Sequence, residues 1–302
     1  MIELINKTTF TFNTEKQNHL HMSWPILKKY YINTGKEISE LLQNLNNNHE
    51  FDKLLSYLHQ NPKKKFIHSM THLENKIKYY SPMKKKDLFL KFAYLDSSNN
   101  KDVIKFADNH GLPKFEKTIY NNAIFPLHKF KDEVKTANEL ISIYELLLKD
   151  DIKELKKIIK RKDKENKKGN ISNHWWEIAK IEIEERNRSL DKKQNVIFLF
   201  LLYISKVIEK YTINKISPVF KQMKYNPNNF NKHFQVLPGW RCSSLLAALY
   251  MQFYLFITEN KEISYCKFCG SPFVKDKSTR SDKKFCSNSC RVRNHQIKNS
   301  NK

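Results

Sequence analysis

Four cysteines close to the C-terminus have the spacing of a metal site. They form two pairs, Cys266 with Cys269 and Cys286 with Cys290, in a chain that holds five cysteines in all. The two residues inside the first pair let both sulfurs point at one ion, and Gly270 permits the tight reversal that follows. Four thiolates close a tetrahedral coordination sphere and leave no open position for water or substrate. The spacing therefore predicts one zinc ion with a structural role and not a catalytic one.

The residues around the second pair predict the shape of this site. The polar stretch 275–284 is long enough for a short hairpin, and Ser287, Asn288 and Ser289 are residue types that begin helices. A helix that starts there carries Cys290 in its first turn. This order predicts a small treble-clef or zinc-ribbon-like knuckle. The apolar groups available for its core are Phe268, Phe273 and Phe285.

The same segment is strongly basic. From Lys261 to Lys302 it holds 11 lysines and arginines against 3 acidic residues, an excess that four thiolates and one zinc ion reduce by only two. We expect nucleic-acid phosphates to bind here, because cations at the start of a metal-pinned helix are placed for such contacts. The predicted contact residues are Arg280, Lys283, Lys284, Arg291, Arg293 and Lys298. The alternative is a knuckle that only caps the rest of the protein, with its charges solvated.

The charge of the whole chain also favours an anionic partner. Its 302 residues include 55 lysines and arginines against 31 acidic residues, which gives a formal net charge of +24. Nucleic acid is the commonest partner for such an excess. The alternative is compositional, since lysine and asparagine are over-used together and part of the excess then belongs to a solvated surface.

Neither an export signal nor a membrane span is visible. Residues 1–6 lack a basic start followed by an apolar run, and the longest apolar stretch is residues 196–204. About twenty apolar residues are needed to span a bilayer. We therefore expect a cytoplasmic protein without a membrane partner, in a reducing compartment where clustered cysteines bind metal more often than they form disulfides.

Composition and periodicity predict a mainly α-helical fold. Only 5 glycines leave few positions for the tight turns of a hairpin-rich β fold. Apolar residues recur at three- and four-residue spacing along three segments. These predicted helices cover residues 130–149, 191–211 and 243–259, the last with Ser243 or Ser244 as its N-cap. Residues 2–12 alternate loosely and predict a short strand or hairpin.

Two further segments bear on the organisation of the helical part. The lysine-rich residues 153–168 indicate the exposed, basic continuation of a helix, followed by a loop. Trp175 and Trp176 are expected to be buried anchors of the next helix. The cysteine cluster starts where the last long helix stops, near Asn260. The predicted domains are 1–260, helical, and 261–302, a four-cysteine zinc finger.

Signs of an enzyme are few. His68 and His72 have the spacing of a helical metal pair, but residues 69–71 lack the glutamate of a zinc hydrolase. Arg293 with His295 could stabilise and protonate during RNA cleavage, although their spacing matches no known motif. The sequence contains no glycine-rich phosphate loop. We therefore predict no catalytic residue and favour a binding protein over an enzyme.

Three segments carry a resemblance to a known family. They are residues 240–250, 265–273 and 285–293. With them the chain resembles the bacterial CGNR-type zinc-finger proteins, whose finger follows an all-helical, stress-associated N-terminal domain. The chain departs from that family after Cys290, where Arg291-Val292-Arg293-Asn294 replaces the Gly-Asn-Arg that gives the finger its name. The resemblance implies a transcriptional regulator with a DNA-binding finger and a helical domain that senses a ligand or partner.

The prediction is a zinc-containing nucleic-acid-binding protein, specifically a DNA-binding transcriptional regulator, with DNA favoured over RNA. The alternative is a host-defence or toxin-like protein whose helical domain acts on RNA as a ribonuclease, with the finger as its RNA grip. A pocket of convergent histidine, arginine and glutamate favours that alternative, whereas an apolar pocket favours a sensor. A third interpretation is a structural finger in a protein–protein module. The oligomeric state stays open, with a homodimer among the alternatives.

Overall fold

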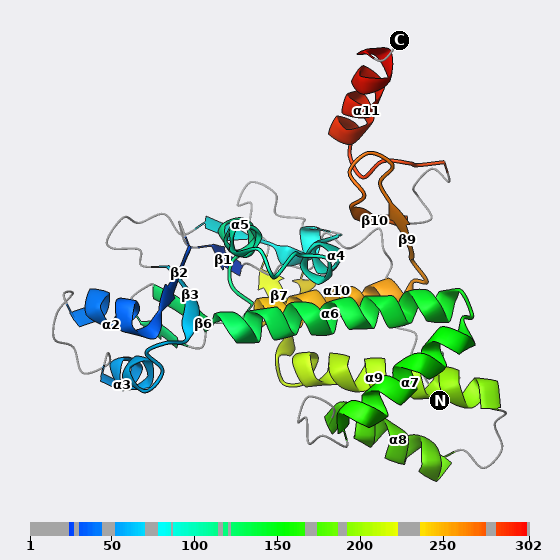
Figure 1. Cartoon of the computed structure of the whole chain (residues 1–302), viewed down its shortest axis with the longest axis horizontal. Coiled ribbons are helices and arrows are strands. Elements are labelled where there is room, and N and C mark those ends of the chain that lie inside the picture. The colour runs from blue at the N-terminus through cyan, green and yellow to red at the C-terminus, as the bar shows by residue number, and fades with distance from the viewer. Residues whose placement is uncertain are drawn as a thin grey trace, which may run out of the picture.

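A computed structural model describes residues 24–26, 30–43, 52–69, 78–85, 87–113, 117–119, 122–166, 174–186, 192–222, 236–275 and 282–300 (Figure 1). Its helices are α2 (Gly35–Gln43), α3 (Asp52–Gln60), the 3-10 helix η2 (Pro82–Lys84), α4 (Leu88–Ala93), α5 (Asn100–His110), α6 (Leu127–Leu148), α7 (Ile152–Asn166), α8 (His174–Arg186), α9 (Lys192–Thr212), α10 (Leu245–Thr258) and α11 (Asn288–Ser300). Its strands are β1 (Trp24–Ile26), β2 (Tyr31–Thr34), β3 (Lys65–Ser69), β4 (Lys78–Tyr80), β5 (Lys117–Ile119), β6 (Asn122–Pro126), β7 (Ile216–Gln222), β8 (Val236–Cys242), β9 (Glu262–Tyr265) and β10 (Pro272–Lys275).

The largest hydrophobic core lies among the long helices, which confirms the prediction of a mainly α-helical fold. α10 is buried almost all round, because apolar side chains occupy most of its positions. α9 packs against α10 and α8, while α6 packs against α4 and α9. Tyr211 of α9 stacks on Tyr250 of α10 with ring centroids 4.0 Å apart, and Tyr144 of α6 lies edge-on to Phe256 at 5.4 Å. Aromatic pairs thus join the helices of this core.

The three helices predicted from periodicity are all present. α6, α9 and α10 begin and end within three residues of the predicted bounds. Ser244 is the N-cap of α10, because its Oγ accepts a hydrogen bond from Ala247 N at 3.0 Å. Trp176 is fully buried and Trp175 half-buried at the start of α8. Within the part of the chain that the structure describes, no helix has both the length and the apolar character needed to cross a bilayer.

Small antiparallel sheets are also present, and the sequence did not predict them. The largest has the strand order β2-β3-β6-β5, with Ile67 of β3 between Ile32 and Phe125 of its neighbours. α2 and α3 connect β2 to β3 and share a second small core with this sheet. The members of that core are Ile38, Leu58, Phe66 and Ile124. Because helices make this connection, it needs no tight glycine turn. The strand predicted for residues 2–12 lies outside the described residues.

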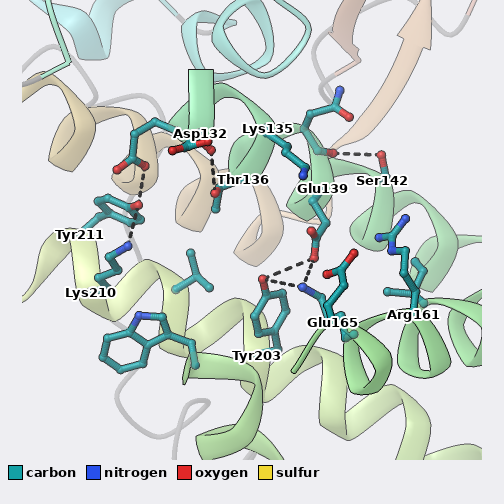
Figure 2. Close-up of a pocket in the computed structure, with 16 residues that line it drawn as sticks. Asp132, Lys135, Thr136, Glu139, Ser142, Arg161, Glu165, Tyr203, Lys210 and Tyr211 are labelled. Atoms are coloured by element: carbon teal, nitrogen blue, oxygen red, sulfur yellow. Dashed lines mark hydrogen bonds and ion pairs between the residues drawn. The ribbon is translucent and has the colours of Figure 1, made fainter. Parts of the chain in front are cut away.

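The lysine-rich segment is a separate helix, α7, in which six of the seven described lysines and arginines are exposed as predicted, but its opposite face is packed, which corrects the prediction of an exposed continuation of the preceding helix. The chain turns after α6 at Asp150, whose φ of 55° lies in the left-handed region, and α7 then packs against α6 and α9. Leu155 is fully buried, and Lys162 is 2% exposed because its ammonium pairs with Glu139 of α6 (Figure 2). Because lysines are so frequent in this segment, its sequence pattern did not predict the buried face that contains Leu155 and Lys162.

A buried glutamine ties α10 to the segment that precedes α4. Gln252 Nε2 donates to the carbonyl oxygens of Pro82 at 2.7 Å and Lys85 at 3.0 Å. Its Oε1 accepts a hydrogen bond from the backbone N–H of Phe89 at 3.0 Å. Both halves of one side-chain amide therefore satisfy backbone groups that are shielded from water.

Replacing Gln252 with leucine is expected to lower the free energy of unfolding by about 2–4 kcal/mol, because buried backbone groups lose their partners. Urea unfolding followed by circular dichroism measures the change. Gln60→Leu at the exposed end of α3 is the matched control and should stay within about 0.5 kcal/mol of the wild type. Equal effects of the two substitutions would contradict the role of Gln252.

A buried histidine in β3 makes stability depend on pH. His68 lies in a strand, so its four-residue spacing from His72 is not that of a helical pair there, and His72 lies outside the described residues. His68 Nε2 is 2.8 Å from Asn33 Oδ1. Burial lowers the pKa of His68 to about 4, although the charge of Glu37 opposes the shift. The native state therefore disfavours the protonated imidazole.

Stability should fall as the pH drops from about 6.5 towards 4, because the unfolded chain takes up the His68 proton first. Between about pH 7 and pH 5, His68 is expected to lower the free energy of unfolding by about 2 kcal/mol. His68→Gln, whose amide can still donate to Asn33, should make this slope shallower in urea unfolding series at several pH values. Exposed His59→Gln is the control and should keep the wild-type slope. An unchanged slope in His68→Gln rules out this origin.

Candidate metal centre

The first pair of cysteines lies at the turn between β9 and β10. These strands pair antiparallel with Tyr265 opposite Pro272. Two backbone hydrogen bonds of 2.9 Å close the turn, from Gly270 N to Cys266 O and from Cys266 N to Ser271 O. Gly270 has a φ of 69°, which confirms the predicted tight reversal at a residue without a side chain.

The second pair is positioned by the start of α11. Ser287 Oγ accepts a hydrogen bond from Cys290 N at 3.2 Å, and Ser287 O accepts one from Arg291 N at 3.2 Å. Ser287 is therefore the N-cap, and Cys290 lies in the first helical turn as predicted. Cys286 directly precedes this cap, so both sulfurs are set by the same helix end.

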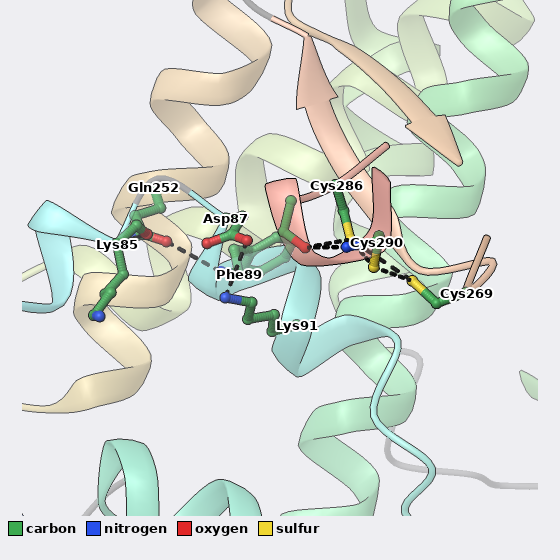
Figure 3. Close-up of polar contacts among 9 residues, drawn as sticks. Lys85, Asp87, Phe89, Lys91, Gln252, Cys269, Cys286 and Cys290 are labelled. Atoms are coloured by element: carbon green, nitrogen blue, oxygen red, sulfur yellow. Dashed lines mark hydrogen bonds and ion pairs between the residues drawn. The ribbon is translucent and has the colours of Figure 1, made fainter. Parts of the chain in front are cut away.

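The four predicted cysteines come together in space. The sulfurs of Cys266, Cys269, Cys286 and Cys290 all lie within 4.8 Å of one another, and Figure 3 shows three of them converging. The Sγ–Sγ distances are 3.6 Å from Cys269 to Cys286, 3.5 Å from Cys286 to Cys290 and 3.7 Å from Cys290 to Cys269. All four are free thiols. Such a cluster can hold one metal ion.

The electrostatics of the cluster favour a bound cation. Burial opposes ionisation of Cys266, but backbone N–H groups beside its sulfur hold its pKa at about 6. Hydrogen bonds from Ser271 also lower the pKa of Cys269. In contrast, burial and the neighbouring thiols raise the pKa of Cys286 to about 12. Four thiolates can therefore coexist here only when a cation compensates their charge.

Tyrosines fasten the knuckle, residues 262–275 and 282–300, to the helical body. Tyr265 Oη donates to Glu145 of α6 at 2.7 Å and shares a hydrogen bond of 2.8 Å with Tyr94 Oη. Tyr144 Oη, also from α6, donates to the backbone carbonyl just before β9 at 3.2 Å. No sequence pattern marks these anchors, because their partners lie more than a hundred residues apart.

The core of the knuckle itself is small. Phe273 is 3% exposed, whereas Phe268 and Phe285 are only half-buried, so one of the three predicted core residues is fully enclosed. The ammonium of Lys283 lies 5.1 Å from the centre of the Phe273 ring. So little apolar burial leaves the cysteine cluster as the main constraint on this part of the chain.

α11 exposes several basic side chains and contains no acidic residue. Arg291, His295 and Lys298 recur at spacings of four and three residues and therefore lie along one face of the helix. Arg293 is exposed on the opposite side. The other predicted contact residues are Lys283 over the Phe273 ring, Lys284 on the surface, and Arg280, which lies outside the described residues.

Comparison with known proteins gives no relative. No family model, no curated protein and no solved structure matches this chain. The resemblance to the CGNR-type proteins therefore stays a prediction from the sequence, and the function must be argued from the site itself.

Replacing Cys286 with serine is expected to weaken metal binding by more than about a hundredfold, because one of four soft donors is lost. Elemental analysis of the purified full chain, together with its helix content by circular dichroism, measures the loss. Cys242→Ser is the matched control, because Cys242 is half-buried at the end of β8 and outside the cluster. Equal metal content in the two variants is the result that contradicts the assigned centre.

Proposed function

We propose that this protein binds nucleic acid through a structural zinc finger and acts as a DNA-binding transcriptional regulator. The observation that carries the proposal is α11, which projects away from the helical body (Figure 1). It starts at the cysteine cluster and exposes Arg291, His295 and Lys298 on one face. A metal-fixed helix that presents the cations Arg291 and Lys298 in this way is suited to contact a phosphate backbone.

Zinc is the proposed ion because of the donor set and the spacing of the sulfurs. Four thiolates are typical ligands of tetrahedral structural zinc. Zinc–sulfur bonds of about 2.3 Å imply sulfur–sulfur separations of about 3.8 Å in a tetrahedron. The separations of 3.5–3.7 Å between Cys269, Cys286 and Cys290 fit this value closely. In the elemental analysis we expect one zinc per chain and no stoichiometric iron.

The geometry of α11 favours duplex DNA over RNA. The major groove of B-form DNA is about 12 Å wide and admits an α-helix. The major groove of A-form RNA is too narrow for side chains to read. Val292 and Ile297 are 50% and 51% exposed, and because they lie on different sides of the helix, one of them at a time could contact thymine methyl groups.

The remaining features agree with an intracellular regulator. Reduced thiols are retained in the cytoplasm, which is the compartment we propose. The net charge of +24 adds long-range attraction to an anionic polymer. The helical body would then hold the finger, through Tyr265 and Glu145, at a defined place on the DNA.

The ribonuclease alternative has one observation in its favour. A cavity in the helical body is lined by Arg161 and by glutamates that include Glu133 and Glu139. Among its described lining residues, however, there is no histidine to transfer the proton. RNA is therefore kept as an arm of the experiment below.

Binding of the zinc-loaded full chain to labelled duplex DNA should fall steeply with salt. The double variant Arg291→Ala/Lys298→Ala removes two charges from one face of α11. It should make the slope of log K against log salt shallower by about 1.8, because about 0.9 is lost per phosphate contact. Fluorescence anisotropy across a salt series measures both slopes.

Lys153→Ala/Lys160→Ala is the matched control, since it removes two exposed charges from α7. It should change the slope by much less than the α11 pair. If both double variants lose the same amount of salt slope, the attraction is spread over the whole protein, and the finger is not the site of contact. If duplex binding is absent while RNA is bound or shortened, the regulator proposal is replaced by the RNA-acting alternative.

A further inference from the structure

The helical body contains a cavity that none of the knuckle residues lines (Figure 2). It has a volume of about 640 Å³ and lies between α6, α7, α8 and α9. Small-molecule sites range over about 300–1,000 Å³. Ile158, Trp175 and Val207 give it an apolar strip, and most other lining side chains are polar or charged.

The walls of this cavity carry opposite charges. The α6 wall presents three carboxylates and one ammonium, which are Asp132, Glu133, Glu139 and Lys135. The facing wall from α7 and α9 presents three cations and one carboxylate, which are Arg161, Lys162, Lys210 and Glu165. Each wall thus favours a ligand group of the charge that the other wall repels.

A polar triad of Glu139, Lys162 and Tyr203 joins the two walls. Buried Lys162 forms an ion pair with Glu139 and donates to Tyr203 Oη at 3.1 Å. Tyr203 Oη lies 3.4 Å from a Glu139 carboxylate oxygen, so each member contacts the other two. A buried ion pair adds little net stability compared with apolar packing. Stabilisation of the fold therefore does not account for this ion pair, whose two residues line the cavity.

One end of the cavity holds the half-buried carboxylate of Glu133. Glu133 accepts a hydrogen bond from Tyr211 Oη, to which Lys210 also donates at 3.0 Å. Within the described part of the chain, Glu133 makes no direct ion pair. Burial raises the pKa of Glu133, although the Tyr211 hydrogen bond and the charges of Lys210 and Lys215 oppose the shift. A ligand ammonium beside this carboxylate would offset the desolvation of its charge.

The other end is marked by an exposed guanidinium. Figure 2 shows Arg161 on the opposite side of the cavity from Tyr211 and Lys210. A guanidinium binds a carboxylate with two parallel hydrogen bonds. Hydroxyl and amide groups of Thr136, Asn138 and Ser142 line the cavity on α6, where a ligand backbone could exchange hydrogen bonds.

We propose that this cavity binds a small zwitterion whose amine and acid lie at opposite ends, as in a di- or tripeptide. The amine contacts Glu133, the carboxylate contacts Arg161, and the apolar strip holds an intervening side chain. The inference does not rest on nucleic-acid binding, because the cavity and the knuckle share no lining residue.

The test titrates the full chain with a panel of Ala-Xaa-Ala tripeptides by isothermal calorimetry, in the absence of nucleic acid. At least one member should bind tighter than about 1 mM. N-acetylation or C-terminal amidation of that peptide should each weaken binding at least tenfold. Glu133→Gln and Arg161→Gln should do the same, whereas Glu154→Gln, an exposed α7 carboxylate outside the cavity, should not.

The proposal is overturned if every free tripeptide binds more weakly than about 1 mM. It is also overturned if the blocked peptides bind as tightly as the free one, or if Glu133→Gln and Glu154→Gln behave alike. Circular dichroism of each variant confirms that the fold is retained. Failure here leaves the DNA salt series untouched, so the two proposals fall separately.

Discussion

The C-terminal part of this protein depends on keeping four thiol sulfurs within 4.8 Å of one another. Ionised sulfurs at that distance repel, and burial together with the neighbouring thiols raises the pKa of Cys286 accordingly. A bound cation would offset this repulsion and would fix the turn after β9 and the first turn of α11. Since Phe273 is the one fully enclosed phenylalanine of the knuckle among those described, coordination here replaces the apolar core that a segment of this size cannot form.

In contrast to the knuckle, the helical body is stabilised by burial of apolar side chains. A few polar side chains within it are buried together with hydrogen-bond partners. α10 is enclosed almost completely, and Gln252 is tolerated there because backbone groups of the η2–α4 segment use its whole amide. Lys162 is tolerated because Glu139 and Tyr203 surround its ammonium. Gln252 and Lys162 thus each contact partners from other elements of the fold, which fixes how those elements are placed.

The sequence predicted what depends on local spacing. Cys266 and Cys269, the reversal at Gly270 and the start of α11 follow from neighbours a few residues apart, and the long helices follow from their apolar period. It did not predict what depends on distant partners. The short strands of the β2-β3-β6-β5 sheet have little periodicity of their own, the inward face of α7 depends on Glu139, and Tyr265 meets residues from α4 and α6. Such pairings become visible only in the folded chain.

The helix α6 contacts both the cavity and the knuckle. Its Glu139 lines the cavity. Its Glu145, six residues or about 9 Å further along the helix, accepts the hydrogen bond from Tyr265 of the knuckle. If α6 moves as a rigid helix, a displacement of its cavity-lining part also displaces the part that contacts the knuckle. If α6 has two positions, a cavity ligand that binds one of them more tightly also shifts the position of the finger. A nucleic acid bound by the finger would then change the affinity for the cavity ligand by the same factor by which that ligand changes the affinity for nucleic acid. In that case α6 alone would couple the two sites.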